Sequence, residues 1–281
     1  TASLAAFSAL GERKEIARVL FMEKGLVMKM KRYASWLYSA GAERGKKITA
    51  ATSTIGALGY YSDAVIIDML GLTDEHIAHH PKPIAEISAD TTVPWKEKNY
   101  NAEYVLTRKP DFIVFSTGLK PSAYAERALF LEPGFLTDYY PQYVKFREFK
   151  LNQVFYTRKN AEQLARTKKF PPNPDGSPAF VGKYNLALSL HSRYEDTKDA
   201  ALLDRIEELS KDIIKTAPAG FTEGYRLLGA VHRKRNDPAG AERYYREAAD
   251  RDDFNYEAQY EMYRMYRDRE ETAASSFHLE K

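Results

Sequence analysis

Apolar positions between residues 12 and 41 recur three or four residues apart. This spacing is typical of an amphipathic helix that packs one face on a core. The basic residues between them are Lys29, Lys31 and Arg32. Because a basic amphipathic helix can also lie on a membrane surface, that alternative stays open. We expect one or two helices, broken near Gly25 and ending near Gly41.

From residue 46 to residue 160, short apolar runs typical of strands alternate with helical patterns. The expected strands are 48–53, 64–69 and 112–116, and the expected helices are 55–61, 73–79, 101–108 and 122–131. Thr73 is the expected N-cap of its helix. Strand, helix, strand order favours parallel pairing with right-handed crossovers. Segments 143–149 and 153–156 are expected to close the domain as an antiparallel hairpin. The pattern predicts an α/β domain with a mostly parallel sheet.

Residues 161–178 form the clearest boundary, a Pro-rich linker, because prolines lack the amide donor that a helix needs. Residues 179–271 are helical in pattern and 272–281 resemble a tail. Six residues, counted from Thr222, match the 34-residue tetratricopeptide pattern: Tyr225, Leu228, Gly229, Ala241, Tyr245 and Ala248. We therefore expect an all-α domain of TPR-like helical repeats, with about two and a half units.

Composition indicates an ordinary globular protein, with 44% hydrophobic and 29% charged residues. The net charge of +3 comes from interspersed signs, which argues against nucleic acid as a partner. The absence of cysteine excludes disulfides and thiolate-bound zinc. No apolar run is long enough for a membrane span, but the chain opens at Thr1 without Met, which suggests a cut from a longer protein.

Two motifs that could hold a cofactor or a metal are incomplete. The run from Gly56 to Gly59 resembles part of a dinucleotide-binding loop, but Thr54 stands at the first glycine position. His76, His79 and His80 have a spacing that suits a metal on one helical turn, but no fourth ligand is evident. We therefore predict no cofactor and no metal. No catalytic residues are predicted either, since no triad or carboxylate pair is recognisable.

Aromatic residues near carboxylates suit sugar rings, which offer apolar faces and hydroxyl edges. The candidate substrate-binding residues are Tyr60, Tyr61, Asp63, Asp68, Asp74 and Trp95, with Tyr100 beside them. The alternative is plain core packing, because large rings are buried for their area alone and the chain has 20 tyrosines.

One block resembles a known family. The run Ile48-Thr-Ala-Ala-Thr-Ser-Thr-Ile-Gly-Ala-Leu-Gly-Tyr-Tyr-Ser-Asp63 is followed by Val65-Ile-Ile-Asp-Met-Leu-Gly-Leu-Thr-Asp74, and a second block spans Tyr104 to Val114. Together they resemble the extracytoplasmic C-terminal domain of multi-pass (GT-C type) polyprenyl-phosphate-sugar-dependent glycosyltransferases, arabinofuranosyltransferase-like. The resemblance covers about residues 26–116. Pro94-Trp-Lys-Glu97 replaces the Gly-His-Glu-like element expected before the second block.

The resemblance implies a soluble accessory domain of a membrane-bound glycosyltransferase of the cell envelope, at the periplasmic face of the inner membrane. Residues 1–45 would lead from the absent membrane part, whose loops would hold the catalytic carboxylate. This segment would not itself be an enzyme. It would bind an acceptor glycan or polyprenyl-linked sugar, or a partner protein at the repeats. The alternatives are a free-standing TPR adaptor that binds an extended peptide, for which a cytoplasmic location stays open, and a small sugar-phosphate or nucleotide enzyme.

Overall fold

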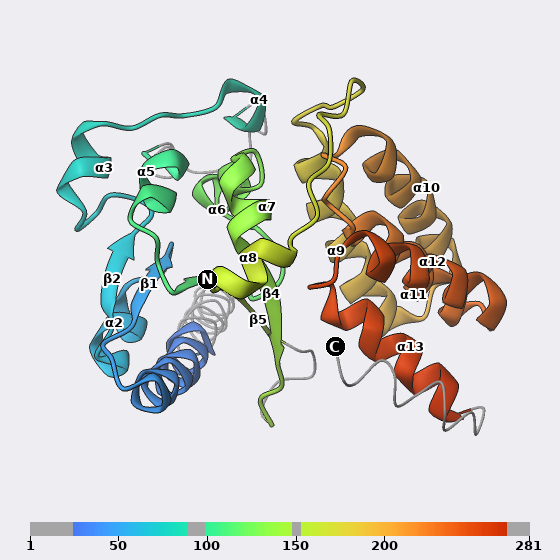
Figure 1. Cartoon of the computed structure of the whole chain (residues 1–281), viewed down its shortest axis with the longest axis horizontal. Coiled ribbons are helices and arrows are strands. Elements are labelled where there is room, and N and C mark those ends of the chain that lie inside the picture. The colour runs from blue at the N-terminus through green and yellow to red at the C-terminus, as the bar shows by residue number, and fades with distance from the viewer. Residues whose placement is uncertain (1–24, 89–98, 148–152, 269–281) are drawn as a thin grey trace, which may run out of the picture.

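The computed structural model describes residues 25–88, 99–147 and 153–268. Figure 1 shows a sheet with short helices on one side of the molecule and a group of longer helices on the other. Residues 25–44 form one helix, which extends one turn beyond the predicted end at Gly41. It is followed by Gly45, whose positive φ of 60° is the conformation glycine commonly supplies after a helix. Among the described residues, no helix has the length and apolarity needed to span a bilayer.

The sheet has five strands in the order β2-β1-β3-β5-β4. The strands are β1 (Thr49–Thr52), β2 (Val65–Asp68), β3 (Phe112–Val114), β4 (Tyr139–Val144) and β5 (Gln153–Arg158). β1 pairs in parallel with β2 and β3, whereas β5 pairs antiparallel with both β3 and β4. The predicted mostly parallel sheet is therefore wrong, and the sheet is mixed. The physical reason is the burial of five of the six β5 residues, which suits β5 to an interior position beside β3.

Short helices flank the sheet. They are α2 (Gly56–Ser62), α3 (Glu75–His79), α4 (Ala85–Ser88), α5 (Ala102–Thr107), α6 (Tyr124–Leu129), α7 (Pro133–Asp138) and α8 (Ala161–Arg166). The predicted cap Thr73 is wrong by one residue, because the Asp74 carboxylate accepts from the Ile77 amide and caps α3. The sequence pattern did not predict α7 or α8. Asn160 caps α8 inside the segment expected to be a linker.

The C-terminal part is helical, as predicted. It comprises α9 (Phe180–Thr197), α10 (Ala200–Thr216), α11 (Glu223–Lys234), α12 (Pro238–Arg251) and α13 (Tyr256–Asp268). Each of these helices packs on the next one along the chain. Figure 1 shows them as a layered group at the right of the molecule. This arrangement buries apolar side chains between successive helices.

The sheet and the C-terminal helices share one hydrophobic core. Phe130, next to α6, lies with its ring centroid 5.9 Å from Tyr184 of α9 and 5.8 Å from Phe221 before α11. On β4, Tyr140 lies 5.6 Å from the ring of Tyr256 in α13. Helix α9, the turn before α11 and helix α13 therefore each contact the α/β part. One face of the helical group is thus occupied within the chain.

A buried polar cluster lies in this interface. Glu223 accepts from Arg226 Nε at 2.8 Å and from the Tyr184 hydroxyl at 3.1 Å. Burial raises the pKa of the hydroxyls of Tyr143, Tyr156 and Tyr184 well above the usual value, so all three stay neutral. Tyr143 and Tyr156 come from β4 and β5. The cluster therefore joins polar groups from both parts of the chain.

Gly229 permits α11 to approach α12 closely. A Cβ atom at this position would lie 2.6 Å from the Tyr245 ring. We predict that Gly229→Ala lowers the free energy of unfolding by about 1–3 kcal/mol through overpacking, measured by urea denaturation. The matched control is Gly182→Ala in α9, where nothing lies within 4 Å and helix propensity predicts a gain of about 0.5–1 kcal/mol. Equal gains from the two substitutions would contradict this account.

Candidate functional site

A crevice opens at the carboxyl ends of β1 and β3. Ser53 and Thr54 follow β1, and Ser116 and Thr117 follow β3, so these four side chains meet at one edge of the sheet. The chain leaves β1 toward β2 on one side and returns to β3 on the other, which makes this the switch point where open α/β sheets bind ligands. The crevice has a volume of about 480 Å³. Its other lining residues are Gly25, Leu26, Lys29, Leu70, Ser122 and Ala123.

Glu126 organises one wall of the crevice. Its side chain is fully buried, and it accepts backbone N–H groups from Ser116 at 2.9 Å, Ser122 at 2.7 Å and Ala123 at 3.1 Å. The hydroxyls of Ser53 and Ser122 donate to the same carboxylate. Both carboxylate oxygens are therefore occupied by the protein itself. The group connects the end of β1, the end of β3 and the start of α6.

Lys29 supplies the positive charge of the crevice. It is half-buried on the helix of residues 25–44. Burial lowers the pKa of its ammonium group, while the charge of Glu126 opposes that shift. Within the described part of the chain, no ion pair joins Lys29 to a carboxylate. Its ammonium group is thus a donor in a crevice otherwise lined by hydroxyls and apolar atoms.

This arrangement suits binding better than acid–base chemistry. A general acid or base must reach the proton it transfers, but both Glu126 oxygens already accept from protein donors. Four of the five hydroxyls already form a hydrogen bond within the protein, so their oxygens can chiefly accept from a ligand, and the ammonium group can donate to an anion. The crevice therefore matches a ligand that offers several hydroxyls and an anionic group.

The structure uses Asp68 and Asp74 to hold a turn. Asp68 is 1% exposed and accepts from the backbone N–H groups of Leu70 at 3.0 Å and Thr73 at 2.7 Å. Asp74 caps α3 at 3.1 Å and lies 4.0 Å from Arg108. Neither carboxylate lines the crevice. Their contacts account for the spacing of these two residues without a ligand.

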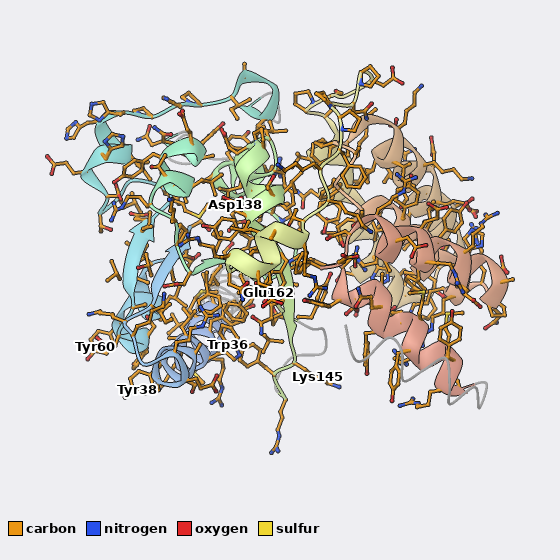
Figure 2. The ribbon with its side chains drawn as sticks, in the orientation of Figure 1. Trp36, Tyr38, Tyr60, Asp138, Lys145 and Glu162 are labelled. Carbon is orange, nitrogen blue, oxygen red and sulfur yellow. The ribbon has the colours of Figure 1, made fainter. Side chains whose placement is uncertain are left out.

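The aromatic candidates do not gather around those aspartates. Tyr60 and Tyr61 lie on α2 with ring centroids 4.8 Å apart, and Tyr60 is 82% exposed. Asp63 follows them and pairs with Lys47 at 3.3 Å. Figure 2 shows Tyr60 at the outer edge near Tyr38, whereas α3 lies at the other end of β2 in Figure 1. The site predicted from sequence is thus split between opposite ends of the sheet.

Two further aromatic candidates lie elsewhere. Trp95 falls outside the described residues. Tyr100 is fully buried, and its hydroxyl accepts from the Ile84 amide at 2.8 Å. Tyr100 is therefore a core residue.

The remaining motifs have structural roles. His76 stacks on His80 at 4.6 Å and on Tyr104 at 4.0 Å. Within the described ranges, no group of three or more histidine or acidic residues is arranged to hold a metal ion. Gly56 begins the seven-residue helix α2, whose N-terminus has no side-chain cap.

The crevice residues were not among the residues predicted from the sequence. The pairs Ser53-Thr54 and Ser116-Thr117 each follow an apolar strand, and that repeated position was a usable signal, because parallel strands end at one edge. Glu126 and Lys29 lie within ordinary helical patterns and gave no such signal.

The α/β part of the chain matches one known family. Residues 21–169 match a family described as a domain of unknown function, DUF8728. The chain belongs to this family. No curated protein matches it, and no solved structure does. The match ends before α9, so it includes the crevice and excludes the C-terminal helices.

Glu126 is expected to be essential for the shape of the crevice. Glu126→Gln places an amide donor among groups that already donate, which leaves buried N–H groups without an acceptor. We predict a loss of about 2–4 kcal/mol in the free energy of unfolding, measured by urea denaturation. The control is Glu162→Gln on the exposed side of α8, which should change stability by less than about 0.5 kcal/mol. Two equally small changes would show that the donors around Glu126 find other acceptors.

Proposed function

We propose that this chain is the non-catalytic, ligand-binding part of a membrane-bound glycosyltransferase of the cell envelope, and that the crevice holds part of the acceptor glycan. The observation that supports this function best is the composition of the crevice. Five hydroxyl side chains, from Ser53, Thr54, Ser116, Thr117 and Ser122, line it together with one ammonium group. Its carboxylate is occupied by protein donors, so the proposed role is binding.

A glycan suits these groups chemically. Sugar hydroxyls both donate and accept, and a sugar would mainly donate to the serine and threonine oxygens, because four of the five crevice hydroxyls already bond within the protein. Lys29 would select a glycan with a phosphate or carboxylate group, because a half-buried ammonium favours a charged hydrogen-bond partner. The size of the crevice falls within the range of small-molecule sites, so it would hold one or two sugar units.

The block that resembles glycosyltransferases supports the same proposal. Its Gly-Leu-Thr-Asp phrase forms the turn after β2, and Leu70 at the start of that turn lines the crevice. Gly71 has a φ of 69°, and a Cβ there would lie 2.9 Å from the Ala78 amide nitrogen. The Gly-Leu-Thr-Asp segment thus has a structural role, because its turn holds the carboxyl edge of the sheet beside the crevice. An extracytoplasmic location is part of this proposal.

The C-terminal helices, in this proposal, are TPR-like repeats. The close approach of Gly229 to Tyr245 and the burial of Ala241 and Ala248 support that assignment. Helices α9, α11 and α13 pack on the side of the sheet, so the helical part would position the α/β part. A free-standing adaptor that binds a peptide on that same face receives less support, because Tyr140 and its neighbours already cover it.

Binding to the crevice can be tested with short arabinan and mannan oligosaccharides, each neutral and singly phosphorylated. We predict that a phosphorylated form binds saturably in isothermal titration calorimetry and that Lys29→Met weakens it about tenfold or more. Lys31→Met is the matched control, because Lys31 lies on the exposed side of the same helix, 4.7 Å from the Tyr61 ring. It should leave binding unchanged. Absence of saturable binding at millimolar concentration would refute the crevice as the glycan site.

The membrane assignment has a separate test. The coding region upstream of Thr1 should encode eight or more hydrophobic spans, and the full-length protein should transfer sugar more slowly when Lys29 is replaced by Met. A start codon immediately before Thr1 would refute a glycosyltransferase parent, whatever the crevice binds.

A further inference from the structure

A second cavity lies where the α/β part meets the C-terminal helices. Its volume is about 470 Å³, within the range of small-molecule sites. Most of its walls are apolar, from α7, the segment before α9 and the turn before α11. The main apolar residues are Phe130, Leu131, Leu136, Phe170, Pro171 and Pro218. The segment expected to be a simple linker therefore forms one wall of this cavity.

Four basic residues line this cavity, and Lys159 is the buried one, since Lys168 and Lys169 are exposed and Arg251 is half-buried. Lys159 follows β5 directly and is 4% exposed. Its ammonium group donates to the Thr137 carbonyl oxygen at 2.9 Å and to the Thr167 hydroxyl at 3.1 Å, and lies 4.4 Å from the Phe254 ring centroid. An ammonium group has three donors. Two of them have protein acceptors, which leaves one for a ligand.

The acidic group of the cavity does not neutralise Lys159 directly. Asp252 lines the same cavity and accepts from the Phe254 amide at 3.0 Å. No ion pair joins Asp252 to Lys159 among the described contacts. Burial raises the pKa of the Asp252 carboxyl and lowers that of the Lys159 ammonium. The charges of Asp252 and Asp138 favour the ammonium form of Lys159, but neither carboxylate forms an ion pair with it among the described contacts, and burial of a charge is costly unless it is paired.

We propose that this cavity binds a small monocarboxylate with an apolar body, its carboxylate on Lys159 and its body against Phe130, Phe170 and the prolines. A monoanion fits better than a phosphate for two reasons. Lys159 offers one remaining donor, whereas a phosphate dianion needs several, and two of the other cations in the lining, Lys168 and Arg251, are already paired with carboxylates of the protein. The nearby Asp252 carboxylate would repel a second negative charge.

The bound ligand would contact both parts of the chain. Leu136 and Lys159 belong to the α/β part, whereas Pro218 and Arg251 belong to the helical part. Ligand binding would therefore fasten the two parts together, since a ligand that binds only the docked arrangement stabilises it by mass action. The cavity shares no lining residue with the crevice, so binding at one site can be tested independently of binding at the other.

The test uses the intact chain and two probe carboxylates, 3-phenylpropanoate and octanoate, in isothermal titration calorimetry. Each is compared with its neutral amide and with the phosphate ester of the corresponding alcohol. At least one carboxylate should bind saturably and raise the melting temperature. Its amide and its phosphate analogue should each bind about tenfold more weakly or worse.

Three variants locate the binding. Lys159→Met should weaken carboxylate binding by about tenfold or more. Ala219→Leu leaves Lys159 in place but narrows the cavity, so it should weaken binding even if Lys159→Met fails to fold. The matched control is Lys145→Met, which should change nothing, because Lys145 is exposed and follows β4 at the opposite end from Asp138 (Figure 2).

Three results would overturn the proposal. They are absence of saturable binding by both carboxylates at millimolar concentration, equal affinity for acid and amide, and undiminished affinity in folded Lys159→Met or Ala219→Leu. Loss of glycan binding in the crevice variant Lys29→Met would have no bearing on these measurements.

Discussion

The docking of helices α9, α11 and α13 on the β4–β5 hairpin is the contact on which the rest of the structure depends. It joins the rings of Phe130, Tyr184 and Phe221 into one core with the sheet. It also buries Arg226 with Glu223, and a buried ion pair contributes little net stability once both charges are desolvated. Tyr184 adds a hydrogen bond to that carboxylate. We infer that the pair chiefly determines where the helices dock, because a displaced docking would leave buried charges unpaired.

Because of this docking, different elements cover the two faces of the sheet. One face is covered by the helix of residues 25–44 and by α2, through Met30, Leu37 and Leu58. The crevice lies at the end of that layer. The other face is covered by α5, α6 and the C-terminal helices, and the second cavity lies where these meet the proline-rich segment. Both hollows therefore occur at the margins of well-packed layers, where elements distant in sequence meet.

Local patterns predicted most elements, because hydrophobic period and capping chemistry are properties of neighbouring residues. The parallel pairing of the first three strands and the C-terminal helices followed from them. The antiparallel hairpin did so only in part, because β4 begins four residues before the predicted segment 143–149. The pattern could not show that β5 would insert between β3 and β4, since that depends on what covers both faces of β5. Thr73 and Asp74 were both plausible caps. The choice between them depended on Asp68, which draws the Thr73 amide and hydroxyl into its own turn.

The candidate site was harder to predict, for a physical reason. A carboxylate in a sequence looks equally available for catalysis, for binding and for capping, and only the donors around it distinguish these roles. Asp68 and Glu126 are each surrounded by backbone N–H groups, so their charge is used to hold loops. The loops so held present Ser53, Ser116 and Ser122 at one edge of the sheet. In this chain the acids shape the crevice, and the hydroxyl oxygens and the Lys29 ammonium group face what enters it.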